Sequence, residues 1–319
     1  MPETVSGIAG FVRLASLDSS CNMYSARRSD YDVTNTVRVS SAADVRDAVQ
    51  ILFARAWPGT DFAPVAKAFQ DFELAFTGRL PGYFGVDTVY HDQQHTLDVT
   101  LAMARLMTGF ESVHAGTPWA LGAERAAVGV CLALFHDIGY LREHGESALN
   151  GAEFTRNHVS RGARFMEYYL PSIGFAHWTR ITSEVVHYTG YEKTFEAIGA
   201  VVTDPRDVQL GHLLGTADMI AQMADRCYLE KCRDRLYPEF VLGGVALPMA
   251  ATGGRDVRYA SGLDLLRQTP GFMEEVRRKR LDEGFDRAYR YIEPLFEGRN
   301  PYIESIDKSL AYLRQILRS

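Results

Sequence analysis

The chain has 319 residues, 46% of them hydrophobic and 23% charged, and its formal net charge is -6 at pH 7. A chain of this length and composition can bury a large core, which excludes a disulfide-stapled miniprotein and disorder over most of its length. The acidic balance also argues against a large nucleic-acid-binding surface, although a bound metal ion can attract a nucleotide locally.

Residues 1–40 are the least helical part of the sequence. Their pattern favours short strands or an ordered arm at 7–12 and 36–39. Ser41 and Asp44 are spaced as a capping box, and the apolar stripe behind them predicts a helix to about residue 55. A second helix is predicted over 62–76.

Helical periodicity dominates from His91 to the end of the chain. It predicts helices over 92–108, 121–136, 150–169, 175–188, 206–226, 229–237, 258–268, 271–297 and 301–317. We therefore predict an all-α protein in which residues 41–319 form one bundle of about ten helices, preceded by an irregular N-terminal arm. Two glycine pairs, at 243–244 and 253–254, indicate a surface loop or a lid over a site.

The sequence is typical of a cytoplasmic protein. Its four cysteines include no Cys-x-x-Cys pair, and a reducing compartment is the simplest one that suits them. The first residues contain no basic segment followed by a long apolar stretch, and no apolar run approaches the ~18 residues of a membrane span. We therefore expect no membrane partner.

Histidine and aspartate residues occur singly in several predicted helices, within apolar surroundings. His136 and Asp137 end an apolar run, and Asp218 lies within another. A carboxylate buried in such a run needs a charged partner or a metal ion. Three further predicted helices each add one imidazole, from His95, His158 and His187. Helical bundles build metal sites from such inward side chains, and imidazole with carboxylate suits Fe, Mn or Zn.

Residues 135–139, Phe-His-Asp-Ile-Gly, resemble the signature of the HD superfamily of metal-dependent phosphohydrolases. Residues 90–99, Tyr-His-Asp-Gln-Gln-His-Thr-Leu-Asp-Val, resemble the Tyr-His-Asn-x-x-His-Ala-x-Asp-Val segment of class I cyclic-nucleotide phosphodiesterases. Thr-Ala-Asp at 216–218 and Glu-x-x-His at 184–187 are similar to later segments of that group. The resemblance spans about residues 85–225, and its ordered set of motifs is far more specific than a lone His-Asp pair.

This resemblance implies an HD-domain fold and two divalent cations (Fe, Mn, Zn or Mg) that hold a hydroxide for hydrolysis of a phosphodiester. The first metal would be bound by four residues, His95, His136, Asp137 and Asp218. His91 would be the general acid that protonates the leaving oxygen, and its spacing from His95 places both on one helix face. A histidine near a dication needs a hydrogen-bonded carboxylate to stay protonated, and Glu184 is one candidate.

The sequence also departs from the phosphodiesterase pattern. Tyr140 stands where those enzymes carry a further histidine. His158 resembles instead the third histidine of HD-GYP phosphodiesterases and of HD-fold di-iron oxygenases. We therefore expect Asp137, His158 and His187 to bind a second metal, with Asp137 bridging the two ions. The Gly-Tyr-Pro motif of the HD-GYP group is absent, because residues 190–192 are Gly-Tyr-Glu.

Further residues are candidates for supporting the site or binding the substrate. Asp98 can orient the ligand His95 or pair on the surface. Cyclic-nucleotide phosphodiesterases clamp the base with Gln-x-Gly-Phe, whereas residues 268–272, Gln-Thr-Pro-Gly-Phe, contain one residue too many. Gln268 and Phe272 are therefore either a base clamp or ordinary residues near a helix start.

Three functions compete for this residue set. The leading one is cleavage of a small-molecule phosphodiester, with a cyclic nucleotide as the expected substrate. A di-iron oxygenase would use the same ligands, although it needs no proton donor such as His91. A non-catalytic module that binds a nucleotide is the third, motivated by the unassigned residues 1–84. The sequence leaves open the metal, the base and the oligomeric state, a homodimer included.

Overall fold

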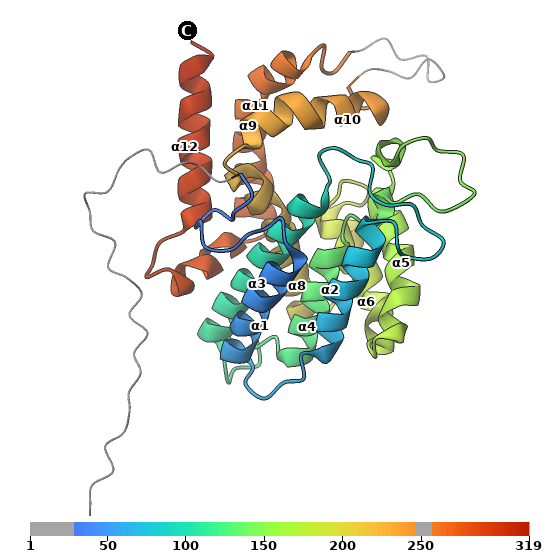
Figure 1. Cartoon of the computed structure of the whole chain (residues 1–319). Helices are drawn as coiled ribbons and strands as arrows, with labels where there is room; N and C mark the ends of the chain where they lie inside the picture. The colour runs from blue at the N-terminus through green and yellow to red at the C-terminus, as the bar shows by residue number, and fades with distance from the viewer. Residues whose placement is uncertain (1–28, 247–256, 319) are drawn as a thin grey trace, which may run out of the picture.

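The computed structural model describes residues 29–246 and 257–318 (Figure 1). The predicted strand at 7–12 and the second glycine pair, at 253–254, lie outside the described residues. Within those two ranges the chain is all-α, as predicted, with twelve α-helices and no strand. The β-type pairings found there are two isolated bridges. Residues 36–39 therefore contribute one bridge, between Tyr31 and Arg38, rather than a strand.

The helices follow one another with short connections. The first eight are α1 (Ala42–Ala56), α2 (Ala63–Phe76), α3 (Gln93–His114), α4 (Ala123–Phe135), α5 (His158–Ser172), α6 (Thr179–Val185), α7 (Phe195–Gly199) and α8 (Pro205–Ala224). The last four are α9 (Tyr228–Lys231), α10 (Tyr237–Leu242), α11 (Gly262–Val276) and α12 (Pro301–Ile316). Short 3-10 or π-helical turns are η1 (Ile138–Tyr140), η2 (Gly151–Phe154), η3 (Ala176–Trp178), η4 (Val186–Tyr188), η5 (Cys232–Leu236), η7 (Arg277–Gly284) and η8 (Ala288–Leu295).

Helices α3 and α8 form the centre of the bundle and carry two of the predicted ligands. Every residue of α3 from His95 to Glu111 is buried, and so is most of α8, as expected of helices surrounded by others. Helix α3 packs against α1, α4 and α8, and Figure 1 shows these helices side by side with α9, α10 and α11 gathered at one end. Polar side chains on the inward faces therefore need partners inside the protein.

Several predicted helices are interrupted. The segment 150–169 contains η2, and α5 begins only at His158. The segment 175–188 divides into η3, α6 and η4. The predicted helices 258–268 and 271–297 are instead α11, which crosses the predicted gap, followed by η7 and η8. Apolar spacing continues across these breaks, so periodicity alone does not reveal them. Of the helices in the described ranges, none has both the length and the apolar character to cross a membrane.

A buried ion pair ties the N-terminal arm to the bundle. Asp32 is fully buried, and its carboxylate accepts three backbone N–H groups from the loop that follows it. Nη2 of Arg105, on α3, lies 2.8 Å from Oδ2 of Asp32, and Nη1 donates to the hydroxyl of Tyr302, on α12, at 2.8 Å. Burial raises the pKa of Asp32, but Arg105 and the hydrogen bonds outweigh burial and lower it overall.

Replacing Asp32 with asparagine is expected to lower the free energy of unfolding by about 1.5–3 kcal/mol at pH 7, because Arg105 then lacks its buried charge partner. Since the folded-state pKa of Asp32 is below the ~3.9 of an unfolded aspartate, the wild type keeps this stabilisation above pH ~4. It loses the stabilisation as the pH falls through the folded-state pKa. Urea unfolding at pH 7 and in acid measures both effects. Equal stability of variant and wild type at pH 7 would refute the expectation.

Candidate metal centre

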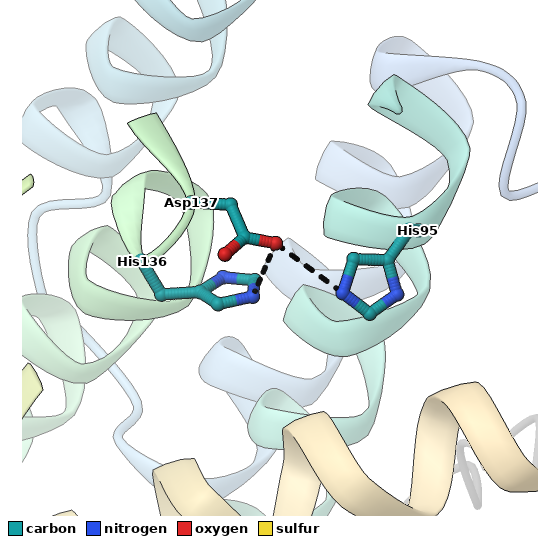
Figure 2. Close-up of side chains that lie close together, drawn as sticks. All are labelled: His95, His136 and Asp137. Atoms are coloured by element: carbon teal, nitrogen blue, oxygen red, sulfur yellow. Dashed lines mark ion pairs between the residues drawn. The ribbon is translucent and has the colours of Figure 1, made fainter. Parts of the chain in front are cut away.

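Four acidic and imidazole side chains meet between α3, the end of α4 and α8. Nε2 of His95 lies 3.4 Å from Oδ2 of Asp137 and 3.5 Å from Oδ1 of Asp218. Nε2 of His136 lies 3.1 Å from the same oxygen of Asp137 and 3.9 Å from Oδ1 of Asp218. Figure 2 shows the closest three, with His95 on one helix facing His136 and Asp137 on the other side. We call these four residues the first half-site.

Helix ends place these side chains. Asp92 caps α3 by accepting the backbone N–H of His95 at 2.9 Å, which fixes the first turn of the helix. His91 precedes this cap and lies outside α3, so the prediction that His91 and His95 share a helix face is wrong. His136 caps the C-terminal end of α4, and Asp137 follows it. These two candidate ligands therefore occupy a turn rather than a helix interior.

Gly139 allows the end of α4 to approach α5 closely. A Cβ atom at this position would lie 1.8 Å from the carbonyl oxygen of His158, so a residue with a side chain cannot be accommodated without displacing the backbone of α5. The turn that carries His136 and Asp137 therefore packs directly against the first residue of α5. This contact brings candidate ligands from two helices together.

Opposite charges dominate the first half-site. Burial lowers the pKa of His95, but Asp137 and Asp218 raise it to about 10. At His136 burial acts in the same direction, and Asp137 again outweighs it, so the pKa is raised. Burial raises the pKa of Asp137, yet His136 and His91 hold it well below its ordinary value. The buried carboxylates therefore need positive charge, from protonated imidazoles or from a bound cation.

The donor set fits a divalent cation. Nε2 of His136 and Oδ2 of Asp137 are buried with no hydrogen-bond partner in the described part of the chain, a costly state without a ligand. Nδ1 of His136 lies 2.8 Å from the carbonyl oxygen of Ala133, an arrangement that leaves Nε2 free for a metal. Tetrahedral ligands with bonds of about 2.1 Å lie ~3.4 Å apart, close to the 3.1–3.9 Å found here.

Asp137 also faces a second group of imidazoles. Its other oxygen, Oδ1, lies 3.6 Å from Nε2 of His158, whose Nδ1 is 3.0 Å from the carbonyl oxygen of Thr155. His187 is buried, and its Nδ1 has no hydrogen-bond partner among the residues described. It interacts electrostatically with His158. Burial lowers the pKa of both imidazoles, which favours the neutral form that binds metals. We call Asp137, His158 and His187 the second half-site.

His91 is held by Glu239, a residue absent from the predicted site. One oxygen of Glu239 bonds Nδ1 of His91, and the other accepts the backbone N–H groups of Tyr90 at 2.8 Å and of His91 at 3.3 Å. Burial lowers the pKa of His91, but Glu239 and Asp137 raise it above its ordinary value. Nε2 is left to donate a proton. The signal in the sequence is that Glu239, like Asp218, is a lone carboxylate within an apolar segment.

Two of the predicted supporting residues make other contacts. Glu184 pairs with Lys193 at 2.6 Å and is not the carboxylate that holds His91. Asp98 is buried one turn after His95, and its Oδ1 has no hydrogen-bond partner in the described ranges. Burial raises the pKa of Asp98 to about 8. A carboxyl group of this kind is largely protonated at pH 7 and does not orient His95 through that oxygen.

Tyr140 lies between two histidines of the site. Its ring stacks on His91 with centroids 4.6 Å apart and an interplanar angle of 17°. On its other face it stacks on His158, with centroids 4.3 Å apart and an angle of 18°. Because Tyr140 is also buried, it is a fixed aromatic spacer between the candidate proton donor and a candidate ligand.

A cavity of about 750 Å³ opens onto the site. Both half-sites and the proton donor contribute to its lining, through His91, Asp137, His158 and Asp218. Phe240 and Tyr259 line it as well, with stacked rings whose centroids are 6.0 Å apart. Gln268 and Phe272 lie on α11, not before a helix start, and both line the cavity.

No family model, curated protein or solved structure matches the chain. The arrangement itself therefore defines what the site can do. It combines a buried cluster of imidazoles and carboxylates, a protonated imidazole held by its own carboxylate, and a cavity that reaches both. Such a combination is suited to binding cations and to moving a proton onto a bound molecule.

Proposed function

We propose that the chain is a metal-dependent phosphohydrolase of the HD superfamily that cleaves a phosphodiester. The observation that supports this most strongly is the His91–Glu239 pair, which lines the same cavity as the metal-binding cluster. Cation binding alone requires no proton donor. Cleavage of a P–O bond, in contrast, creates an oxygen that is best released after protonation, and a positioned histidine supplies that proton.

The two half-sites would divide the cation ligands between them. When bound, two divalent cations supply an activated water molecule and neutralise charge on the phosphoryl group. Asp137 would contribute one oxygen to each ion, since its two oxygens face different imidazoles. His91 would donate the proton on Nε2 to the leaving oxygen. Glu239 would keep that proton on His91 despite the positive charges nearby.

The cavity favours a small phosphodiester as the substrate. Its volume of about 750 Å³ lies within the range of roughly 300–1,000 Å³ that is usual for small-molecule sites. The stacked rings of Phe240 and Tyr259 offer an aromatic surface for a base. Gln268 and Phe272 line the same space. A nucleotide, and a cyclic nucleotide in particular, is the substrate class that these features support.

Reconstitution with Mn²⁺ and, separately, with anaerobic Fe²⁺ tests this proposal. Nitrophenol released from bis(4-nitrophenyl) phosphate measures phosphodiester cleavage without any assumption about the base. We expect turnover in the metal-loaded protein and none after chelation. Full metal occupancy without turnover would contradict the proposal. Oxygen consumption by the iron form would then favour the oxygenase, and tight nucleotide binding without product would favour the binding module.

A further inference from the structure

The Gly-Tyr-Glu segment at 190–192 connects the two histidines of the second half-site. Oε1 of Glu192 accepts the backbone N–H of Val159 at 2.9 Å, and Oε2 accepts that of Ser160 at 3.1 Å. The hydroxyl of Ser160 donates to the same Oε2. These N–H groups belong to the first turn of α5, where backbone donors have no partner within the helix. The residue before α5, Asn157, makes no side-chain cap.

Glu192 therefore caps α5 from a distant position in the sequence. The helix it caps begins with His158, whose ring direction is set by the first turn and by the hydrogen bond to Thr155. A carboxylate at this end of a helix also interacts favourably with the helix dipole. Removing Glu192 would leave buried or partly buried donors unpaired at the very residues that orient His158.

The segment that carries Glu192 also carries His187. A Cβ atom on Gly190 would lie 2.7 Å from Cγ2 of Val159, so this segment packs tightly on the first turn of α5. On its other side, Arg280 donates to the carbonyl oxygens of Tyr188 at 2.6 Å and of Gly190 at 3.0 Å. The segment is thus fixed between α5 and η7, with Glu192 as its charged contact to α5.

We propose that Glu192 is a positioning residue that holds His158 and His187 together as the second half-site. The hydrogen bonds of its carboxylate go to α5 and not to the four residues of the first half-site. Loss of Glu192 should therefore weaken binding of the second cation and spare the first. The inference rests on the proposed function, because it assumes that the two half-sites bind cations.

Counting Mn²⁺ per full-length chain, by equilibrium dialysis and elemental analysis, tests the role of Glu192. The wild type should bind two ions and give the electron paramagnetic resonance spectrum of a coupled pair. In Glu192→Ala the second ion should bind about 10–100-fold more weakly, and at low Mn²⁺ the spectrum should be that of an isolated ion. Glu192→Gln keeps an acceptor oxygen and should recover part of the second-ion affinity.

Ser41→Ala is the matched control, because it removes the side-chain cap of α1, away from the site. It should cost about 1 kcal/mol of stability and leave two ions bound. Two ions and a coupled spectrum in Glu192→Ala, at wild-type affinity, would overturn the inference. Should that variant fail to fold, unchanged second-ion affinity in Glu192→Gln would overturn it instead. A wild type that binds no ion would overturn the proposed function itself, and one that binds a single ion would overturn only the second half-site.

Discussion

Replacing Asp137 with alanine is expected to remove cation binding at both half-sites and to abolish phosphodiester cleavage. Oδ2 of Asp137 lies within 3.4 Å of His95 and His136, and Oδ1 lies 3.6 Å from His158. One side chain thus serves both ions. Cation affinity should fall by more than the ~10–100-fold that follows loss of a residue behind a ligand. Elemental analysis after dialysis and the nitrophenyl phosphate assay measure the two losses.

Asp207 provides the control for this variant. It is also a buried aspartate, on α8, and its partner is Arg125 at 2.6 Å rather than the histidine cluster. Asp207→Asn should lower stability and leave the cation content unchanged. Wild-type cation content in Asp137→Ala would contradict the proposed bridging role. Loss of cations from both variants would trace the effect to general destabilisation rather than to a lost ligand.

His91→Ala should keep the full cation content and reduce kcat by about 10²–10⁴-fold on a substrate with a poor leaving group, such as a cyclic nucleotide. An alkoxide oxygen needs the proton that His91 supplies. Nitrophenolate leaves without protonation, so cleavage of bis(4-nitrophenyl) phosphate should suffer much less. Equal losses on the two substrates would contradict the role of general acid, and loss of cations would identify His91 as a ligand instead.

The same role fixes the pH dependence of a Glu239→Gln variant. A general acid must be protonated, so turnover falls as the pH rises through the pKa of His91. Glu239 helps to raise that pKa, and its neutral replacement lowers it again. The decline of kcat on the alkaline side should therefore begin at a lower pH in Glu239→Gln than in the wild type. An alkaline limb that does not move would exclude this support.

The helical fold follows from local patterns, but its breaks do not. The stripe behind Ser41 and the spacing of apolar residues in α3 and α8 predict helices close to those observed, because these helices are packed on regular neighbours. The predicted helix 150–169 fails at His158, where α5 is capped by Glu192 from elsewhere in the chain. Tertiary hydrogen bonds thus set a boundary that periodicity cannot locate.

The site divides in the same way. His95, His136, Asp137 and Asp218 could be picked out because each is a polar residue in an apolar run or a motif, and the fold places them within 4 Å of a partner. Glu239 could not be assigned to His91 from sequence, since α10 and the start of α3 meet only in the folded chain. Glu184 was a reasonable candidate by spacing, but Lys193 already occupies it.

The stacked ring of Tyr140 acts as an insulator between two histidines that share one pocket. Imidazole is the commonest metal ligand in proteins, so His91 could be drawn onto a cation that His158 holds. The phenol between them offers no competing imidazole nitrogen, and burial, its largest influence, raises the pKa of its hydroxyl well above the ordinary value, so it stays neutral. One histidine can therefore remain a proton reservoir while its neighbour, on the far face of the ring, remains a ligand.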